Sequence, residues 1–289
     1  MHVITQIRKL SLWIFLIPFL AINLCLIISQ NPEFLETTIF TVDQIGRSGF
    51  SIPYLDGSLS ISRASRTFPQ YLIFKPAMIL TAVLLYYYWS NNNKLINQYK
   101  STNINYKFKT FGILSAVFLA IRSIFLGIKF DIQIYKLLRR VVLLLFIIFE
   151  IIAQGILVYH FFKIKSLLVK LINKKILILK IILVSILATV AILSLPILLN
   201  KDNTHFKHAL EWNYFVGVIL FYLFSRFFWK RTTEISRLSP RNLAVLARRF
   251  MRYRQAFPMN YSSATRSTFL PFKLEPLGFS LNGQLRVAS

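Results

Sequence analysis

The sequence predicts an all-α membrane protein: a six-transmembrane helical bundle with both termini in the cytosol, a long lumenal loop between spans one and two, and a basic cytosolic tail. Two observations support this prediction. The first is the set of long apolar segments, and the second is the distribution of lysine and arginine between the two sides of the membrane. Only 16% of the 289 residues are charged and 55% are hydrophobic, whereas a soluble domain has about 25% charged residues. The composition therefore argues against a soluble enzyme and against a disordered protein.

Six apolar segments each approach the roughly 20 residues that a membrane-spanning helix needs. Lipid offers no hydrogen bonds to the backbone, so we expect each segment to be helical. Arg8 and Lys9 precede the first segment, and no small-x-small cleavage site follows it, which favours an uncleaved span over a signal peptide. The predicted spans are residues 12–28, 72–89, 111–128, 141–162, 176–199 and 214–229.

The basic residues set the predicted orientation, because cytosolic loops carry the excess of lysine and arginine. The loops after spans two and four contain lysine and no acid, and with both termini they fall on one side of a six-span chain. The opposite side holds residues 31–71, 129–140 and 200–213, which contain most of the acids. The loop 129–140 contains four basic residues and fits this orientation least well.

The chain divides into a six-span membrane domain, residues 1–231, and a tail, residues 232–289, in which arginine replaces lysine. Ser239 and Pro240 predict the start of a basic amphipathic helix, and the tail beyond Pro258 has the composition of a disordered segment. We expect this helix either to bind the anionic lipids of the cytosolic leaflet or to be solvated.

The net charge of +25 lies in loops and tail and fits an anionic membrane surface, so no nucleic-acid partner is expected. Cys25 is the single cysteine, which excludes an intrachain disulfide and a CxxC metal site. The four histidines lack the HExxH spacing, and no P-loop or GxSxG motif occurs. The sequence predicts no cofactor and no metal, and it identifies no catalytic residue.

Ionisable residues inside spans are costly and often functional. Arg122 in span three and Glu150 in span four have similar predicted depths, and Gln154 lies one turn from Glu150. We expect Arg122 and Glu150 to form an ion pair that Gln154 extends, either as a packing contact or as part of a transport or active site. Three other basic residues lie nearer the ends of spans and are expected to snorkel to the surface: Lys75, Lys180 and Arg226.

The predicted lumenal side carries a second polar group. His205, His208 and Glu211 follow each other at intervals of three residues, so a helix would place them near one face. They could bind a metal or act as an acid–base set, or they could simply form the hydrated start of a helix. The end of the first loop mixes aromatic and polar residues, and we expect it to fold onto the membrane surface.

Two short motifs suggest a family. The first loop ends in SISRASRTFPQYLIF, residues 60–74, in which Pro69, Gln70 and Tyr71 match the family most closely, and the last span opens with Glu211-Trp212. With the six-span layout, these motifs resemble the eukaryotic family that contains the autophagy modulators called DRAM and the Golgi proteins that remodel the lipid of GPI anchors. The similarity in the arrangement of spans and loops covers residues 12–229.

The resemblance implies a six-pass protein of the Golgi, the endoplasmic reticulum or the lysosome that acts on lipids or on lipid-anchored proteins. For the GPI branch it implies help in exchanging fatty acyl chains on the anchor, with membrane lipids and GPI-anchored proteins as partners. It also implies a lumenal site for lipid headgroups, whose candidates are Ser60, Ser62, Arg66, His205, His208 and Glu211.

Two other function classes stay open at this stage. A small carrier or channel would use Arg122 and Glu150 as a polar pathway, and Pro18, Pro76 and Pro196 could kink its spans. A non-catalytic membrane adaptor would instead use the basic tail to dock a partner or anionic lipid.

Overall fold

A computed structural model describes residues 2–31, 51–99, 107–126, 133–166, 168, 171–199 and 203–230. The regular elements of these residues are α-helices, with one isolated β-bridge between residues far apart in the chain. The tail 232–289, with its predicted amphipathic helix, lies outside the described residues, as does the first part of the predicted lumenal loop.

Five helices are long and apolar enough to cross a membrane, which makes the chain an integral multi-pass membrane protein. They overlap the first five predicted spans. Several also continue beyond the apolar segments, because an apolar run marks the membrane core and not the end of the helix. The five helices are α1 (His2–Gln30), α5 (Gln70–Tyr99), α6 (Lys107–Phe125), α7 (Gln133–Lys163) and α8 (Lys174–Leu199).

The sixth predicted span lies within α9 (Thr204–Phe228). This helix begins ten residues before the predicted span and includes the polar stretch with His205, His208 and Glu211. Its role as a sixth span stays a prediction. The predicted loop 129–140 is largely helical, because α7 already begins at Gln133.

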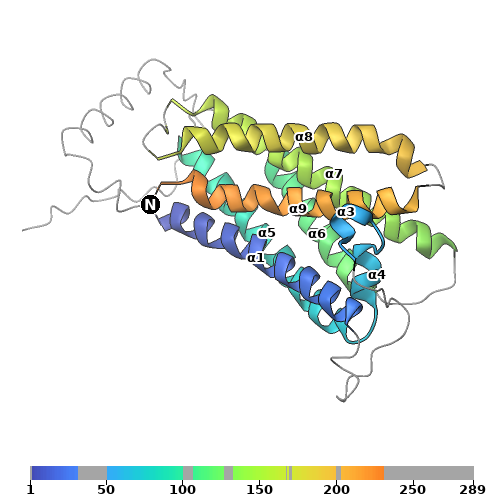
Figure 1. Ribbon diagram of the computed structural model, residues 1–289. Coiled ribbons are helices and arrows are strands. Elements are labelled where there is room, and N and C mark those ends of the chain that lie inside the picture. The colour runs from blue at the N-terminus through green and yellow to red at the C-terminus, as the bar shows by residue number, and fades with distance from the viewer. Residues whose placement is uncertain are drawn as a thin grey trace, which may run out of the picture.

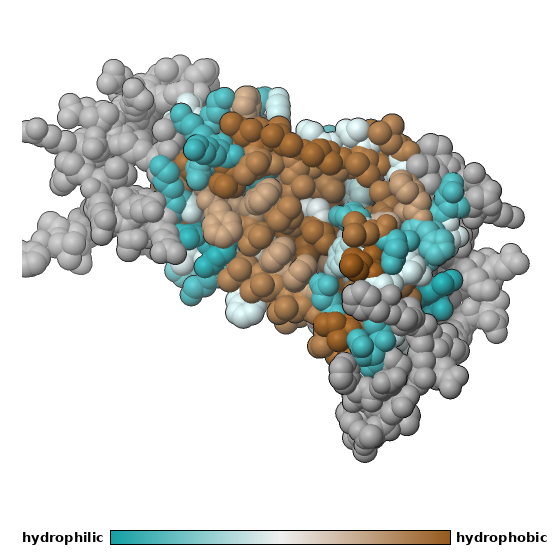
Figure 2. All heavy atoms as spheres, viewed as in Figure 1, coloured by the Kyte–Doolittle hydropathy of each residue, from teal (hydrophilic) through white to brown (hydrophobic). Residues whose placement is uncertain are grey.

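The long helices lie side by side in a bundle (Figure 1), and their contacts close it into a ring. Each contacts the next along the chain, α1 to α5, α5 to α6, α6 to α7, α7 to α8 and α8 to α9, and α9 closes the ring against α1. On the face that Figure 2 shows, hydrophobic residues occupy the middle of the bundle and hydrophilic residues lie toward both ends. Such a band is the surface that a membrane core would cover.

The end of the predicted lumenal loop packs onto one end of this ring, which we call the cap end. It forms two short helices, α3 (Pro53–Asp56) and α4 (Ile61–Arg66), which contact α9 and α1. Trp212 donates from Nε1 to the Leu59 carbonyl at 2.7 Å. Gly57 has φ +59°, and a Cβ atom there would overlap the His205 carbonyl, so this turn requires glycine. The loop end therefore folds onto the bundle itself.

At the opposite end of the ring, backbone hydrogen bonds join two segments that are distant in sequence. Ile172 and Trp229 form the antiparallel bridge, the Asn173 amide donates to the Phe228 carbonyl at 2.9 Å, and the Lys230 amide donates to the Leu171 carbonyl at 3.0 Å. These bonds join the connection before α8 to the end of α9.

Gly112 allows α5 and α6 to approach closely. A Cβ atom on Gly112 would overlap the indole ring of Trp89, which is fully buried, whereas a Cβ atom on Gly155 would lie 3.6 Å from Val184 Cγ1. We expect Gly112→Ala to lower the free energy of unfolding by about 1–3 kcal/mol through overpacking. Thermal unfolding in detergent micelles measures this loss. The matched control Gly155→Ala should be neutral or slightly stabilising, and equal losses in both variants would contradict the packing argument.

Candidate functional site

The ring encloses a cavity of about 80 Å³ that reaches from the cap end toward the middle of the bundle. One water molecule needs about 10–15 Å³ of such space, so the cavity has room for several. Its walls are mainly aliphatic and aromatic side chains of α1, α5, α6, α7 and α9, with Ile61 of α4 at the cap end. The charged residues in this lining are Arg122, Glu150 and Glu211, which three different helices contribute.

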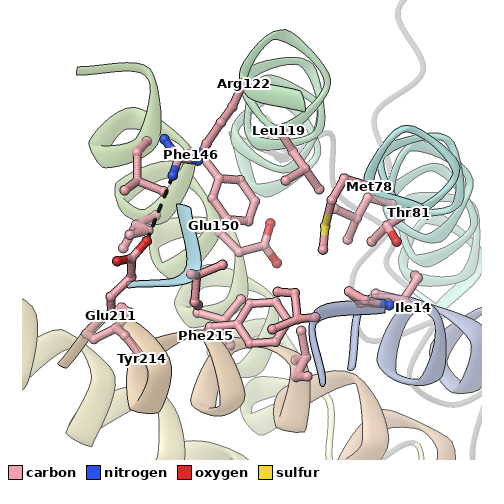
Figure 3. A pocket seen from close by; sticks show the side chains of 18 of the residues that line it. Ile14, Met78, Thr81, Leu119, Arg122, Phe146, Glu150, Glu211, Tyr214 and Phe215 are labelled. Carbon is pink, nitrogen blue, oxygen red and sulfur yellow. Dashed lines mark ion pairs between the residues drawn. The ribbon is translucent and has the colours of Figure 1, made fainter. Parts of the chain in front are cut away.

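Arg122 and Glu211 form an ion pair across the cavity (Figure 3), with Arg122 Nη2 and Glu211 Oε1 3.9 Å apart. Their side chains are 15% and 22% exposed, so both are shielded from bulk water. The Ile61 backbone amide also hydrogen-bonds to the Glu211 carboxylate. The predicted ion pair of Arg122 with Glu150 is therefore corrected: within the described residues Arg122 pairs with Glu211 of α9, and Glu150 has hydroxyl and amide partners.

Glu150 is fully buried and points into the cavity (Figure 3). Its Oε1 atom accepts hydrogen bonds from the Tyr222 hydroxyl and, at 3.0 Å, from Gln154 Nε2. Its Oε2 atom lies 2.5 Å from the Ser115 hydroxyl. Gln154 also reaches the Val218 carbonyl at 3.4 Å. The predicted contact between Glu150 and Gln154 is present, and hydroxyl groups of α6 and α9 complete it.

Lys180 corrects a second expectation, because it does not snorkel. It is 1% exposed, and its Nζ atom donates to the Ser225 hydroxyl at 2.8 Å. The ammonium lies 3.9 Å from the centroid of the Phe221 ring, a cation–π contact. Because Lys180 lies on the face of α8 that packs against α9, the side chain enters the bundle instead of reaching the membrane surface.

The predicted lumenal headgroup candidates do not converge on the cavity. Ser60 caps α4 by accepting from the Arg63 amide at 3.2 Å, and Ser62 lies beside it with its hydroxyl 3.3 Å from that of Ser60. Arg66 is exposed at the end of α4. Among the six candidates, the described lining of the cavity includes Glu211 alone.

The two histidines serve the cap end. His208 Nδ1 lies 3.0 Å from the Gly57 carbonyl, and His205 is exposed beside the same turn. Asp56 closes this turn, and hydrogen bonds, first from the Ser58 amide, lower the pKa of its carboxyl below the usual value. In the described residues, groups of three metal-ligating side chains close enough to hold an ion are not found. His208 and Glu211 thus have separate partners despite their helical spacing.

Sequence reasoning missed the uncharged members of the polar network, above all Ser115, Tyr222, Tyr88 and Ser225. The Tyr88 hydroxyl lies 3.0 Å from that of Ser225, and the rings of Tyr88 and Tyr222 meet edge to face at 4.9 Å. Tyr88 is 1% exposed and lies inside the bundle. Single hydroxyl groups in apolar segments carry no sequence signal that marks them as partners of a buried charge.

Comparisons of the chain with protein-family models, with curated proteins and with solved structures return no match.

Proposed function

We propose that this protein binds a membrane lipid in the cavity of the helix ring, with the lipid's polar group at Arg122 and Glu211. The observation that supports this proposal is the distribution of polarity within the cavity. Its walls are predominantly apolar, and the Arg122–Glu211 ion pair lies at its cap end. An amphiphile has the same division between an apolar chain and a polar head.

The chemistry of the ion pair favours a phosphate-bearing head. A guanidinium can bind a phosphate group through two parallel hydrogen bonds. The Arg122–Glu211 distance of 3.9 Å is long for a charge-assisted hydrogen bond. In our proposal the lipid phosphate binds the Arg122 guanidinium in place of Glu211. Glu211 keeps its hydrogen bond from the Ile61 amide.

The family resemblance leads us to a finer proposal. We propose that the lipid is part of a GPI anchor, that the protein assists its acyl-chain remodelling, and that it resides in the Golgi or the endoplasmic reticulum. In this proposal the cap end faces the lumen, where GPI anchors are carried, and α9 is the sixth span.

A photo-crosslinking experiment tests the lipid site. The full-length protein in lipid nanodiscs is labelled with photoactivatable phosphatidylinositol, and in parallel with photoactivatable phosphatidylcholine. We expect Arg122→Gln to reduce labelling by about tenfold, since losing one charge-assisted contact costs on the order of 1.5–3 kcal/mol. Arg66→Gln makes the same change at an exposed position of the cap end and should leave labelling unchanged.

The outcomes separate the two levels of the proposal. Equal labelling in Arg122→Gln and in the unaltered protein would overturn the lipid site. Labelling that depends on Arg122 but does not prefer the inositol lipid would retain the lipid site and remove the GPI proposal.

A carrier is the second candidate function, because Glu150 places a buried carboxyl in the same cavity. If the protein is a carrier, a solute should cross the membrane of proteoliposomes that contain it, and Glu150→Gln should abolish this transport. A lipid-binding protein without carrier activity predicts the same solute permeability as protein-free vesicles.

A further inference from the structure

The described lining of the cavity contains more acidic than basic side chains. Its charged residues are the guanidinium of Arg122 and the carboxyls of Glu150 and Glu211. Two arginines of the cap end, Arg63 and Arg66, are exposed and lie outside this lining. A ligand with only negative charge would meet an unfavourable field in this cavity, whereas a ligand that also has a positive group would meet a favourable one.

The ion pair makes the same requirement at a defined place. In the free protein Arg122 and Glu211 compensate each other, with Nη2 and Oε1 3.9 Å apart. A phosphate that replaces Glu211 on Arg122 leaves the Glu211 carboxylate without its opposite charge and next to a second anion. A charge that is shielded from water and has lost its partner is costly. A positive group on the same headgroup would remove this cost, because it could pair with Glu211.

Glu211 can accept such a group. A carboxylate has about four acceptor sites, and the partners of Glu211 in the described part of the chain are the Ile61 amide and the Arg122 guanidinium. A primary ammonium is compact, has three N–H donors and forms a charge-assisted hydrogen bond with a carboxylate. A quaternary ammonium has no N–H group and cannot form this bond. The site therefore favours a primary over a quaternary ammonium.

Glu150 is too far from Arg122 to be the partner of the same headgroup. Glu150 Oε2 lies 2.5 Å from the Ser115 hydroxyl. Ser115 and Arg122 are seven residues apart on α6, which corresponds to about 10 Å along the helix axis. The short linker of an ethanolamine phosphate does not span that distance. Glu150 also already accepts hydrogen bonds from Tyr222 and Gln154, so Glu211 is the carboxyl that such a head can reach.

We propose that the cavity selects a phospholipid whose head has a primary ammonium beside its phosphate, with the phosphate on Arg122 and the ammonium on Glu211. This inference rests on the proposed lipid site and names the class of lipid that the site takes. Binding then replaces one ion pair with two, and each charge keeps an opposite charge. Phosphatidylethanolamine has this chemistry, and so does the glucosamine-bearing phosphatidylinositol of a GPI anchor. Phosphatidylcholine and unmodified phosphatidylinositol lack a primary ammonium.

Photo-crosslinking with pairs of probes that differ only in the ammonium tests the inference on the full-length protein in lipid nanodiscs. One pair is photoactivatable phosphatidylethanolamine and its N-acetyl derivative, and the other is photoactivatable glucosaminyl-phosphatidylinositol and its N-acetyl derivative. We expect the amine of at least one pair to label about tenfold more strongly than its N-acetyl derivative, the usual effect of one hydrogen bond between charged groups. The pair that shows this preference identifies the source of the head.

Glu211→Gln should make the two members of that pair label equally, because the amide retains an acceptor but has no charge. Asp56→Asn is the matched control. It makes the same change at an exposed carboxyl of the cap end that lies outside the cavity lining, and it retains an acceptor for the turn. Its preference for the amine should equal that of the unaltered protein.

The outcomes distinguish this inference from the lipid site on which it rests. Labelling that depends on Arg122 but is equal for amine and N-acetyl derivative in both pairs would overturn the inference and retain the lipid site. Labelling that does not depend on Arg122 would overturn both. A preference for the amine that persists in Glu211→Gln would overturn the assignment of the ammonium to Glu211. The comparison of probes on the unaltered protein decides the lipid class even if Glu211→Gln fails to fold.

Discussion

Trp212→Ala should lower the free energy of unfolding by about 3–5 kcal/mol, the usual cost of removing a fully buried large aromatic side chain. Trp212 is 0% exposed where α9 meets the cap end. Its ring meets that of Tyr54 at 4.8 Å, and its indole nitrogen donates to the Leu59 carbonyl. The substitution therefore removes packing and a hydrogen bond that hold the segment between α3 and α4 against the ring.

Denaturation in detergent micelles, followed by circular dichroism, measures the loss. Trp13→Ala is the matched control, because Trp13 of α1 is 53% exposed and its removal should change stability by no more than about 0.5 kcal/mol. Trp212→Phe keeps an aromatic ring but removes the Nε1 donor to the Leu59 carbonyl, which predicts an intermediate loss of about 1–3 kcal/mol. Equal effects at Trp212 and Trp13 would mean that the cap end does not depend on this contact.

The helices were predictable because apolar segments of membrane length have few alternatives to helix. The same physics identified Arg122 and Glu150 as notable, since each places an ionisable group inside an apolar segment, whereas Glu211 was identified by its spacing from His205 and His208 and by the Glu211-Trp212 motif. Position along the sequence gives the depth of a residue but not the direction in which a helix turns it. Arg122 pairs with Glu211 of α9, because both side chains point into the same cavity, which the sequence does not show.

Lys180 is a second residue whose direction the sequence could not predict. Its distance from the end of the predicted span favoured snorkelling, but the face of α8 on which it lies packs against Phe221 and Ser225. The cavity itself has no counterpart in the sequence, because it is the space left where side chains of six helices meet. The role of Gly57 at the cap end likewise depends on a carbonyl of α9 that is distant in sequence.

Removing one partner of the Arg122–Glu211 ion pair should destabilise the protein more than removing both. Arg122→Met and Glu211→Met each remove one charge of the ion pair and leave the other inside the bundle, and for well-buried pairs this costs about 3–5 kcal/mol. Because 15% and 22% of these side chains are exposed, we expect the lower end, about 3 kcal/mol for each single variant. The double variant Arg122→Met/Glu211→Met replaces the pair with apolar groups. Its free energy of unfolding should lie within about 1 kcal/mol of that of the unaltered protein.

This double-mutant cycle also separates the stability of the site from its proposed chemistry. A double variant that recovers stability but still fails to crosslink photoactivatable phosphatidylinositol would show that the guanidinium is needed for the lipid and not only for folding. A double variant that recovers both stability and labelling would leave the ion pair as a packing contact between α6 and α9 and would remove the headgroup site. Losses in the two single variants that simply add in the double variant would contradict any direct coupling between Arg122 and Glu211.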